Sequence, residues 1–123
     1  ISFKSKNFIY QKSDIIILAT DLNDTTKHLI NSKLSKLIKS KPLIINIARG
    51  PIIEEKALIF LLQKKIIKGA CLDVFEYEPL TKRSKLTKFN NVILTSHNAF
   101  NTKDEVNKVH LNTYKNLISG LKK

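Results

Sequence analysis

The chain has 123 residues, of which 42% are hydrophobic, and its 22 lysines and arginines against 10 acidic residues give a net charge of +12. This length suffices for one domain, and no apolar run is long enough to predict a membrane span. The basic residues are spread along the chain without an accompanying aromatic pattern, so the charge does not predict nucleic-acid binding. The single cysteine, Cys71, gives no disulfide framework, which is compatible with the expected cytoplasmic location. It lies in an apolar run and is expected to be a buried, unreactive thiol.

The first half of the chain holds two of four apolar runs that predict strands. A helical turn capped by Asn7 is expected first. Residues 14–19 include three consecutive isoleucines, which is typical of a strand buried on both faces. Asn31 and Ser32 can cap a helix over residues 33–39, and a second strand is expected at residues 43–47, after Pro42.

The second half continues the same alternation. Glu54 and Glu55 favour the start of a helix that runs to about residue 65, and a strand at residues 69–74 follows. Residues 75–90 are polar, and we expect an irregular loop with one helical turn near residues 84–86. After a strand at residues 91–95, Thr102 caps a final helix whose apolar stripe extends to residue 121. Such alternation through short links predicts an α/β fold with about four parallel strands and right-handed crossovers.

Polar residues directly after three of these strands are the candidate functional residues. Arg49 follows the second strand, Asp73 and Glu78 follow the third, and His97 follows the fourth. The carboxyl ends of parallel strands meet at one edge, where open α/β sheets bind ligands. A guanidinium, two carboxylates and an imidazole at that edge suit proton and hydride chemistry on a substrate that carries a carboxylate.

Three blocks of sequence around these residues resemble, in order and spacing, the D-isomer-specific 2-hydroxyacid dehydrogenases. They are Asn46-Ile47-Ala48-Arg49-Gly50, residues 69–79 in the pattern G-A-x-L-D-V-F-x-x-E-P, and residues 91–97 in the pattern N-V-x-L-T-x-H. The resemblance covers about residues 13–120 and implies a parallel-sheet, Rossmann-type NAD-binding domain. The Gly-x-Gly-x-x-Gly turn of a complete domain has no counterpart in the chain. We therefore expect residues 1–123 to be the second half of that domain, excised from a longer protein and without its substrate domain.

The resemblance implies a role for each candidate residue. Arg49 anchors the substrate carboxylate, His97 donates and accepts the proton, and Glu78 hydrogen-bonds His97. Asp73 contacts the nicotinamide carboxamide, with a turn or helix cap as the alternative. Cofactor contacts are also implied for Thr20, Asp21, Thr26, Ile47, Ala48 and Ala99, in addition to Arg49 and His97, and no metal site is implied.

Two positions depart from the family pattern. The family usually has proline where this chain has Asp21, and the acid would either disfavour a phosphorylated ribose or point to solvent. Ser96 stands where proline often precedes the histidine, which leaves the choice of substrate open. Glu76 competes with Glu78 as the partner of His97, and the resemblance selects the glutamate before proline. His28 and His110 are expected to be structural.

The implied activity is reversible hydride transfer between NAD and a D-2-hydroxy acid, for example of the 3-phosphoglycerate or lactate type. The partners expected for the full-length enzyme are a small 2-hydroxy or 2-oxo acid and a second copy in a homodimer, with no nucleic acid and no membrane. The isolated chain is expected to be inactive. The alternative is a non-catalytic nucleotide-binding module, as in co-repressors with this fold and motif set. A third, weaker possibility is a remnant of a truncated gene. The sequence does not name the acid or choose between NAD and NADP.

Overall fold

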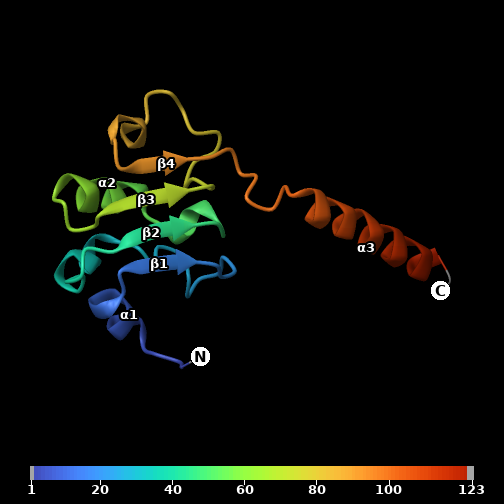
Figure 1. Ribbon diagram of the computed structural model, residues 1–123, viewed down its shortest axis with the longest axis horizontal. Helices are drawn as coiled ribbons and strands as arrows, with labels where there is room; N and C mark the ends of the chain where they lie inside the picture. Colours follow the sequence, from blue (N-terminus) through green and yellow to red (C-terminus); the bar gives the residue numbers. More distant parts are fainter. Residues whose placement is uncertain (1, 122–123) are drawn as a thin grey trace.

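A computed structural model describes residues 2–121 as a sheet of four parallel strands with helices beside it (Figure 1). The elements in chain order are α1 (Lys6–Lys12), β1 (Ile15–Leu18), the 3-10 helix η1 (Ser32–Lys36), β2 (Leu43–Asn46), the 3-10 helix η2 (Gly50–Ile52), α2 (Glu55–Gln63), β3 (Gly69–Leu72), the 3-10 helix η3 (Lys85–Lys88), β4 (Val92–Leu94) and α3 (Lys103–Leu121). The strands pair in the order β1-β2-β3-β4, and every pair is parallel. The predicted α/β fold with a parallel sheet is confirmed.

The register of the sheet ends all four strands in one row. Leu18 is aligned with Asn46, Asn46 with Leu72, and Leu72 with Leu94. In Figure 1 the four arrowheads accordingly lie at the same edge, and the chain leaves this edge after β4 toward α3. The segments that follow the strands therefore begin side by side, at the edge where ligands of open α/β sheets bind.

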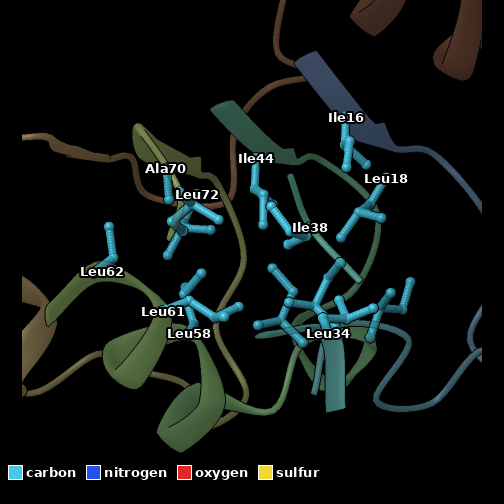
Figure 2. Packing of buried hydrophobic residues seen from close by; sticks show 14 of the residues in the cluster. Ile16, Leu18, Leu34, Ile38, Ile44, Leu58, Leu61, Leu62, Ala70 and Leu72 are labelled. Carbon is cyan, nitrogen blue, oxygen red and sulfur yellow. The ribbon is translucent and has the colours of Figure 1, made fainter. Parts of the chain in front are cut away.

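The hydrophobic core lies between one face of the sheet and the helical segments (Figure 2). Because side chains alternate along a strand, every second residue of the sheet points into this core. The sheet contributes Ile16, Leu18, Ile44, Ala70 and Leu72, and the helical segments contribute chiefly Leu34, Ile38, Leu58, Leu61 and Leu62. Each fully buried aliphatic side chain stabilises the fold by about 1.5–3 kcal/mol. The buried residues of α2, which include Ala57, lie on one face of the helix.

The opposite face of the sheet is open, so the expectation that residues 14–19 are buried on both faces is wrong for this chain. Ile17 and Ile93 are 59% and 62% exposed. Cys71 lies in the same row and is partly exposed, contrary to the expectation of a buried thiol. The reason is topological. When strands follow one another in order with right-handed crossovers, every connection lies on the same face of the sheet.

The caps and types of two short helical segments also differ from expectation. The hydroxyl of Ser5, and not the side chain of Asn7, caps α1 by accepting from the backbone N–H of Phe8 at 3.3 Å. Asn31 caps the next segment as expected, but that segment is a 3-10 helix. Inside it the Ser35 hydroxyl donates to the Ser32 carbonyl at 2.9 Å, which competes with α-helical backbone bonding in so short an element.

The final helix, α3, forms where the sequence predicts it and begins after a capping contact from Thr102 to the N–H of Glu105 at 3.3 Å. It buries none of its side chains within residues 2–121, and Figure 1 shows it projecting away from the sheet. Its apolar stripe, which includes Val109, Leu117 and Leu121, is therefore exposed. In the part of the chain that the structure describes, no helix combines the length and apolar character needed to cross a membrane.

The open face and the outer edge of β1 predict self-association of the isolated chain. Isoleucines of neighbouring strands form an apolar patch, and β1 presents backbone groups at the edge of the sheet. We expect light scattering to report oligomers of the 123-residue chain. The substitution Ile17→Lys places a charge within the patch, on its edge strand, and should shift the population toward monomer.

Phe3→Lys is the matched control, because Phe3 is 99% exposed and lies outside the sheet. A monomeric wild-type chain would contradict the prediction, and so would dissociation of the Phe3→Lys and Ile17→Lys variants to the same extent.

Candidate active site

The turn that carries Arg49 is shaped by a buried asparagine at the end of β2. The side-chain amide of Asn46 donates to the carbonyl of Arg49 at 3.1 Å, and its oxygen accepts from the N–H of Ala48 at 3.1 Å. A fully buried polar side chain with both ends satisfied fixes the turn. Arg49 itself is exposed, and its guanidinium donates to the Ala48 carbonyl at 2.7 Å. The ion pairs found within residues 2–121 do not involve it.

A hollow of about 470 Å³ lies beside this turn, where the chain leaves β1 and β2. It is lined by Ala19, Thr20, Asp21, Leu22, Ile47, Ala48 and Arg49. The structure thus brings five of the expected cofactor-binding residues together. Thr26 instead holds the loop in shape, since its hydroxyl accepts from the N–H of Asn23 at 2.8 Å and donates to the Asp21 carbonyl at 2.6 Å.

Asp73 connects the end of β3 to the loop after β4. One carboxylate oxygen accepts from the Thr95 hydroxyl at 2.6 Å and from the N–H of Asn98 at 3.0 Å, and the other accepts from the N–H of Ala99 at 2.8 Å. These donors flank His97 on both sides. Burial acts to raise the pKa of Asp73, but the three hydrogen bonds and the nearby His97 ring together outweigh it and lower the pKa. Asp73 therefore acts as the turn cap, and its second oxygen can still accept another donor.

The contact expected between His97 and Glu78 is present. Nδ1 of His97 lies 3.1 Å from Oε2 of Glu78, and Oε1 of Glu78 accepts from the N–H of Phe75 at 3.0 Å. The hydrogen bond from Phe75 lowers the pKa of Glu78, burial opposes it, and the contact with His97 lowers it further. His97 has a φ of 57°, in the left-handed region that is unfavourable for most residues. The hydrogen bonds that the residues around His97 donate to Asp73 offset the cost of this backbone conformation.

A second hollow, of about 560 Å³, lies beside the His97–Glu78 pair. Phe75, Pro79, Leu80 and Leu94 give it an apolar lining. Arg49 lines the neighbouring hollow after β1 and β2, whereas Glu78 and His97 line this one. The Arg49 guanidinium folds back onto the carbonyl of Ala48.

The competing glutamate, Glu76, contacts a different histidine. Its Oε1 lies 2.8 Å from Nε2 of His28, and its Oε2 accepts from the N–H of Glu55 at 2.7 Å. Within residues 2–121 no group of three or more histidines, cysteines and acidic residues is arranged to hold a metal ion.

The sequence patterns do not single out Asn46, Thr95 or the pair formed by Glu76 and His28. For Asn46 and Thr95 a usable signal exists, because a polar residue at the end of an apolar strand must find a partner once it is buried. The Glu76–His28 contact joins residues far apart in the chain, and no local signal identifies it.

Comparisons with known proteins support the fold of the chain. Residues 1–99 match the family model of the D-isomer specific 2-hydroxyacid dehydrogenase NAD binding domain. The chain is 38% identical over 122 residues to a glyoxylate reductase of Thermofilum pendens. The matched region covers 99% of this chain and 36% of that relative. A D-isomer specific 2-hydroxyacid dehydrogenase of Lactobacillus delbrueckii ssp. bulgaricus, solved in its NAD complexed form, matches with a TM-score of 0.80 and 28% identity over 97% of this chain and 41% of that one.

A second solved structure, of a D-isomer specific 2-hydroxyacid dehydrogenase from Xanthobacter autotrophicus Py2 in complex with NADPH and MES, matches with a TM-score of 0.65. It is 39% identical and covers 69% of this chain and 28% of that one. The chain thus spans 28–41% of the length of these relatives. Its sheet is a Rossmann-type half-domain, as the sequence predicts.

The lowered pKa of Asp73 predicts an acid-dependent loss of stability. Because the folded-state pKa lies below the ordinary value of about 4, the carboxylate stabilises the fold fully above that value, and this contribution is lost as the pH falls through the folded-state pKa. In Asp73→Asn the amide NH₂ cannot accept from the backbone N–H groups, which should lower the free energy of unfolding at neutral pH by about 2 kcal/mol. The variant should also lose less stability in acid than the wild type. Urea unfolding at low protein concentration, from about pH 5 to about pH 2.5, measures both effects.

Asp24→Asn serves as the control, because Asp24 lies in the exposed turn after β1. Its acid dependence should match that of the wild type. Equal acid dependence for wild type and Asp73→Asn would show that Asp73 does not hold the loop after β4.

Proposed function

The chain belongs to the D-isomer specific 2-hydroxyacid dehydrogenase family, and we propose that it is the half of the NAD-binding domain that carries the acid–base machinery of such an enzyme. The members of this family are oxidoreductases that bind a nicotinamide cofactor. The proposed reaction is reversible hydride transfer between that cofactor and a small D-2-hydroxy acid. The observation that carries the proposal is the contact of 3.1 Å between Glu78 and His97 at the carboxyl edge of the sheet.

This contact supports Nε2 of His97 as the atom that exchanges the proton. The lowered pKa of Glu78 keeps its carboxylate ionised near neutral pH, where it can only accept hydrogen bonds. Nδ1 of His97 therefore carries a hydrogen, and Nε2 of the neutral ring is free to take the proton of the substrate hydroxyl. In oxidation this proton moves to Nε2 while the hydrogen on C2 leaves with its electron pair and the C2–O double bond forms. In reduction Nε2 returns the proton to the oxygen.

Arg49 is proposed to bind and orient the substrate carboxylate. A guanidinium has five N–H donors, and the described contact to the Ala48 carbonyl occupies one. The remaining donors suit two parallel bonds to a carboxylate. Arg49 is the third residue after the end of β2, and His97 is the third residue after the end of β4. The two residues therefore lie on either side of the segment after β3. A rotation of the Arg49 side chain away from its own backbone would direct its charge toward substrate.

The residues present fit a nicotinamide cofactor, which when bound supplies the hydride acceptor and donor. The hollow beside Thr20, Asp21 and Ile47 offers an apolar wall and backbone groups, and Asp73 keeps one acceptor position for a carboxamide. Asp21 lines this hollow, and its negative charge would repel a phosphorylated ribose bound there, which supports NAD over NADP. Relatives with either cofactor are known, since one matched structure contains NAD and another NADPH.

The complete enzyme is proposed to add a glycine-rich, phosphate-binding half and a substrate domain, because the chain spans only 36% of the glyoxylate reductase it matches. Selectivity for the acid is proposed to come largely from that substrate domain. The isolated chain is then expected to bind NAD weakly and to be inactive. The homodimer and the cytoplasmic location stay predictions, and no observation favours the non-catalytic module over the enzyme.

The proposed function is tested by following NADH consumption by the complete protein with glyoxylate, pyruvate and hydroxypyruvate. At least one acid should be reduced. His97→Asn should lower kcat by about 100-fold or more, because a positioned acid–base group is lost while asparagine tolerates the left-handed backbone. His110→Asn, on the exposed helix α3, is the matched control and should keep the wild-type rate. Failure to reduce any acid, or equal rates for the two histidine variants, would refute the proposal.

The role of Arg49 is tested separately. Arg49→Lys should raise KM for the 2-oxo acid by about 10-fold or more, because an ammonium group cannot form two parallel bonds with a carboxylate. The affinity for NADH, measured by fluorescence, should change less than KM. Arg83→Lys, in the exposed loop before η3, should leave KM unchanged. A larger effect of Arg49→Lys on NADH affinity than on KM would assign Arg49 to the cofactor instead.

A further inference from the structure

Glu76 stands between the two carboxylates of the site, Asp73 and Glu78, yet it contacts neither His97 nor its loop. Its carboxylate lies 2.8 Å from Nε2 of His28 and accepts from the N–H of Glu55 at 2.7 Å. The side chain is only 13% exposed. A largely buried carboxylate with a partner on each oxygen is held in one position.

The two partners of Glu76 belong to the segments after the two preceding strands. His28 lies in the segment after β1, and its N–H donates to the Pro51 carbonyl at 2.9 Å. Glu55 begins α2 directly after the Arg49 turn and η2. The backbones of these segments continue side by side, since the N–H of Ile30 donates to the Ile52 carbonyl at 3.2 Å. Glu76 therefore joins the segments that follow β1, β2 and β3.

The segment after β3 also packs directly on the Arg49 turn. A Cβ atom added to Gly50 would lie 1.7 Å from the Phe75 carbonyl oxygen and 2.6 Å from the Glu76 nitrogen. Only a glycine permits this close approach of two backbones. The contacts of Glu76 are thus made beside this close approach between the Arg49 turn and the segment after β3.

A short path connects Glu76 to His97. The residue before Glu76 is Phe75, whose N–H holds one oxygen of Glu78 at 3.0 Å, while the other oxygen contacts His97 at 3.1 Å. Without the anchor at Glu76, only the close packing on Gly50 would hold the Phe75 backbone against the Arg49 turn, and the bond from Phe75 that orients Glu78 would be less firmly positioned. If Glu76 only capped the helix, it would stabilise α2 without any effect on this path.

We propose that Glu76, held by His28 and by the start of α2, is a positioning residue that orients Glu78 toward His97 through the backbone of Phe75. This inference rests on the proposed function for its kinetic consequences, but not for the contact itself. It adds to the site a second histidine–glutamate pair, formed by His28 and Glu76.

The first test is a double-mutant cycle in the complete enzyme, with Glu76→Ala and Glu78→Gln singly and together. Glu76→Ala should lower kcat by about 10-fold, and it should cost little more once Glu78 is already replaced, because both changes act on the same contact. Glu76→Gln should restore most of the rate, since its amide oxygen can still accept from the N–H of Glu55. Glu54→Ala, which removes the neighbouring carboxylate at the start of α2, is the matched control and should keep the wild-type kcat. Additive losses in the cycle would overturn the proposal.

The second test does not need turnover. In the complete protein with labelled histidine, NMR at a fixed neutral pH reports the environment of the His97 ring. Glu76→Ala should shift the His97 signals toward their positions in Glu78→Gln, and Glu54→Ala should leave them unchanged. His97 signals that stay at their wild-type positions in Glu76→Ala would overturn the proposal even if the enzyme is active. A shift in a protein without hydride-transfer activity would support the contact path and refute the proposed function alone.

Discussion

The geometry of the candidate site depends on one constraint, the parallel register that ends four strands in a single row. Leu18, Asn46, Leu72 and Leu94 are aligned across the sheet, so the segments that follow them begin at the same height. Residues at equal distances beyond the row then become neighbours even though they are far apart in the chain. A slip of one residue in any pair would turn that strand's core residues to the open face. The buried alternation of Ile16 and Leu18 in β1, and of Ile44 and Asn46 in β2, opposes such a slip.

The two lowered carboxylate pKa values at this edge arise from different causes and serve different purposes. Asp73 is buried, and it remains ionised because three donors satisfy it, which commits it to holding the loop around His97. Glu78 is 39% exposed on its side chain, and its pKa is lowered mainly by the single backbone bond from Phe75. The more exposed carboxylate can therefore respond to the protonation of its histidine partner, while the buried one keeps the backbone fixed. Because one acid holds the backbone and the other contacts the histidine, both fit within a segment of six residues without competing for His97.

Much of the fold could be predicted from the sequence, because short β-branched runs and capped apolar stripes are local signals. The same runs could not reveal that one sheet face is open, since Ile15 and Ile17 look alike whether or not a partner covers them. Arg49, Asp73, Glu78 and His97 could be assigned to one edge because each follows a strand. Their pairing could not be derived locally. Glu76 and Glu78 are two residues apart and chemically identical, and only the fold shows that His28 takes the first and His97 the second. The resemblance to the family supplied that choice.

The position of Glu76 also bears on how a dinucleotide can bind. The start of a helix that follows a strand at this edge commonly receives a phosphate, because its N–H groups are unpaired and its dipole is positive there. At the start of α2 the carboxylate of Glu76 already accepts from the N–H of Glu55, so the negative charge is supplied by the chain itself. A pyrophosphate at this helix would meet a buried carboxylate and repulsion. The three glycines of the chain form no Gly-x-Gly-x-x-Gly turn that could replace it. In the proposed function the described residues would therefore provide proton transfer and carboxylate recognition, and tight cofactor binding would depend on a phosphate-binding turn that they do not form.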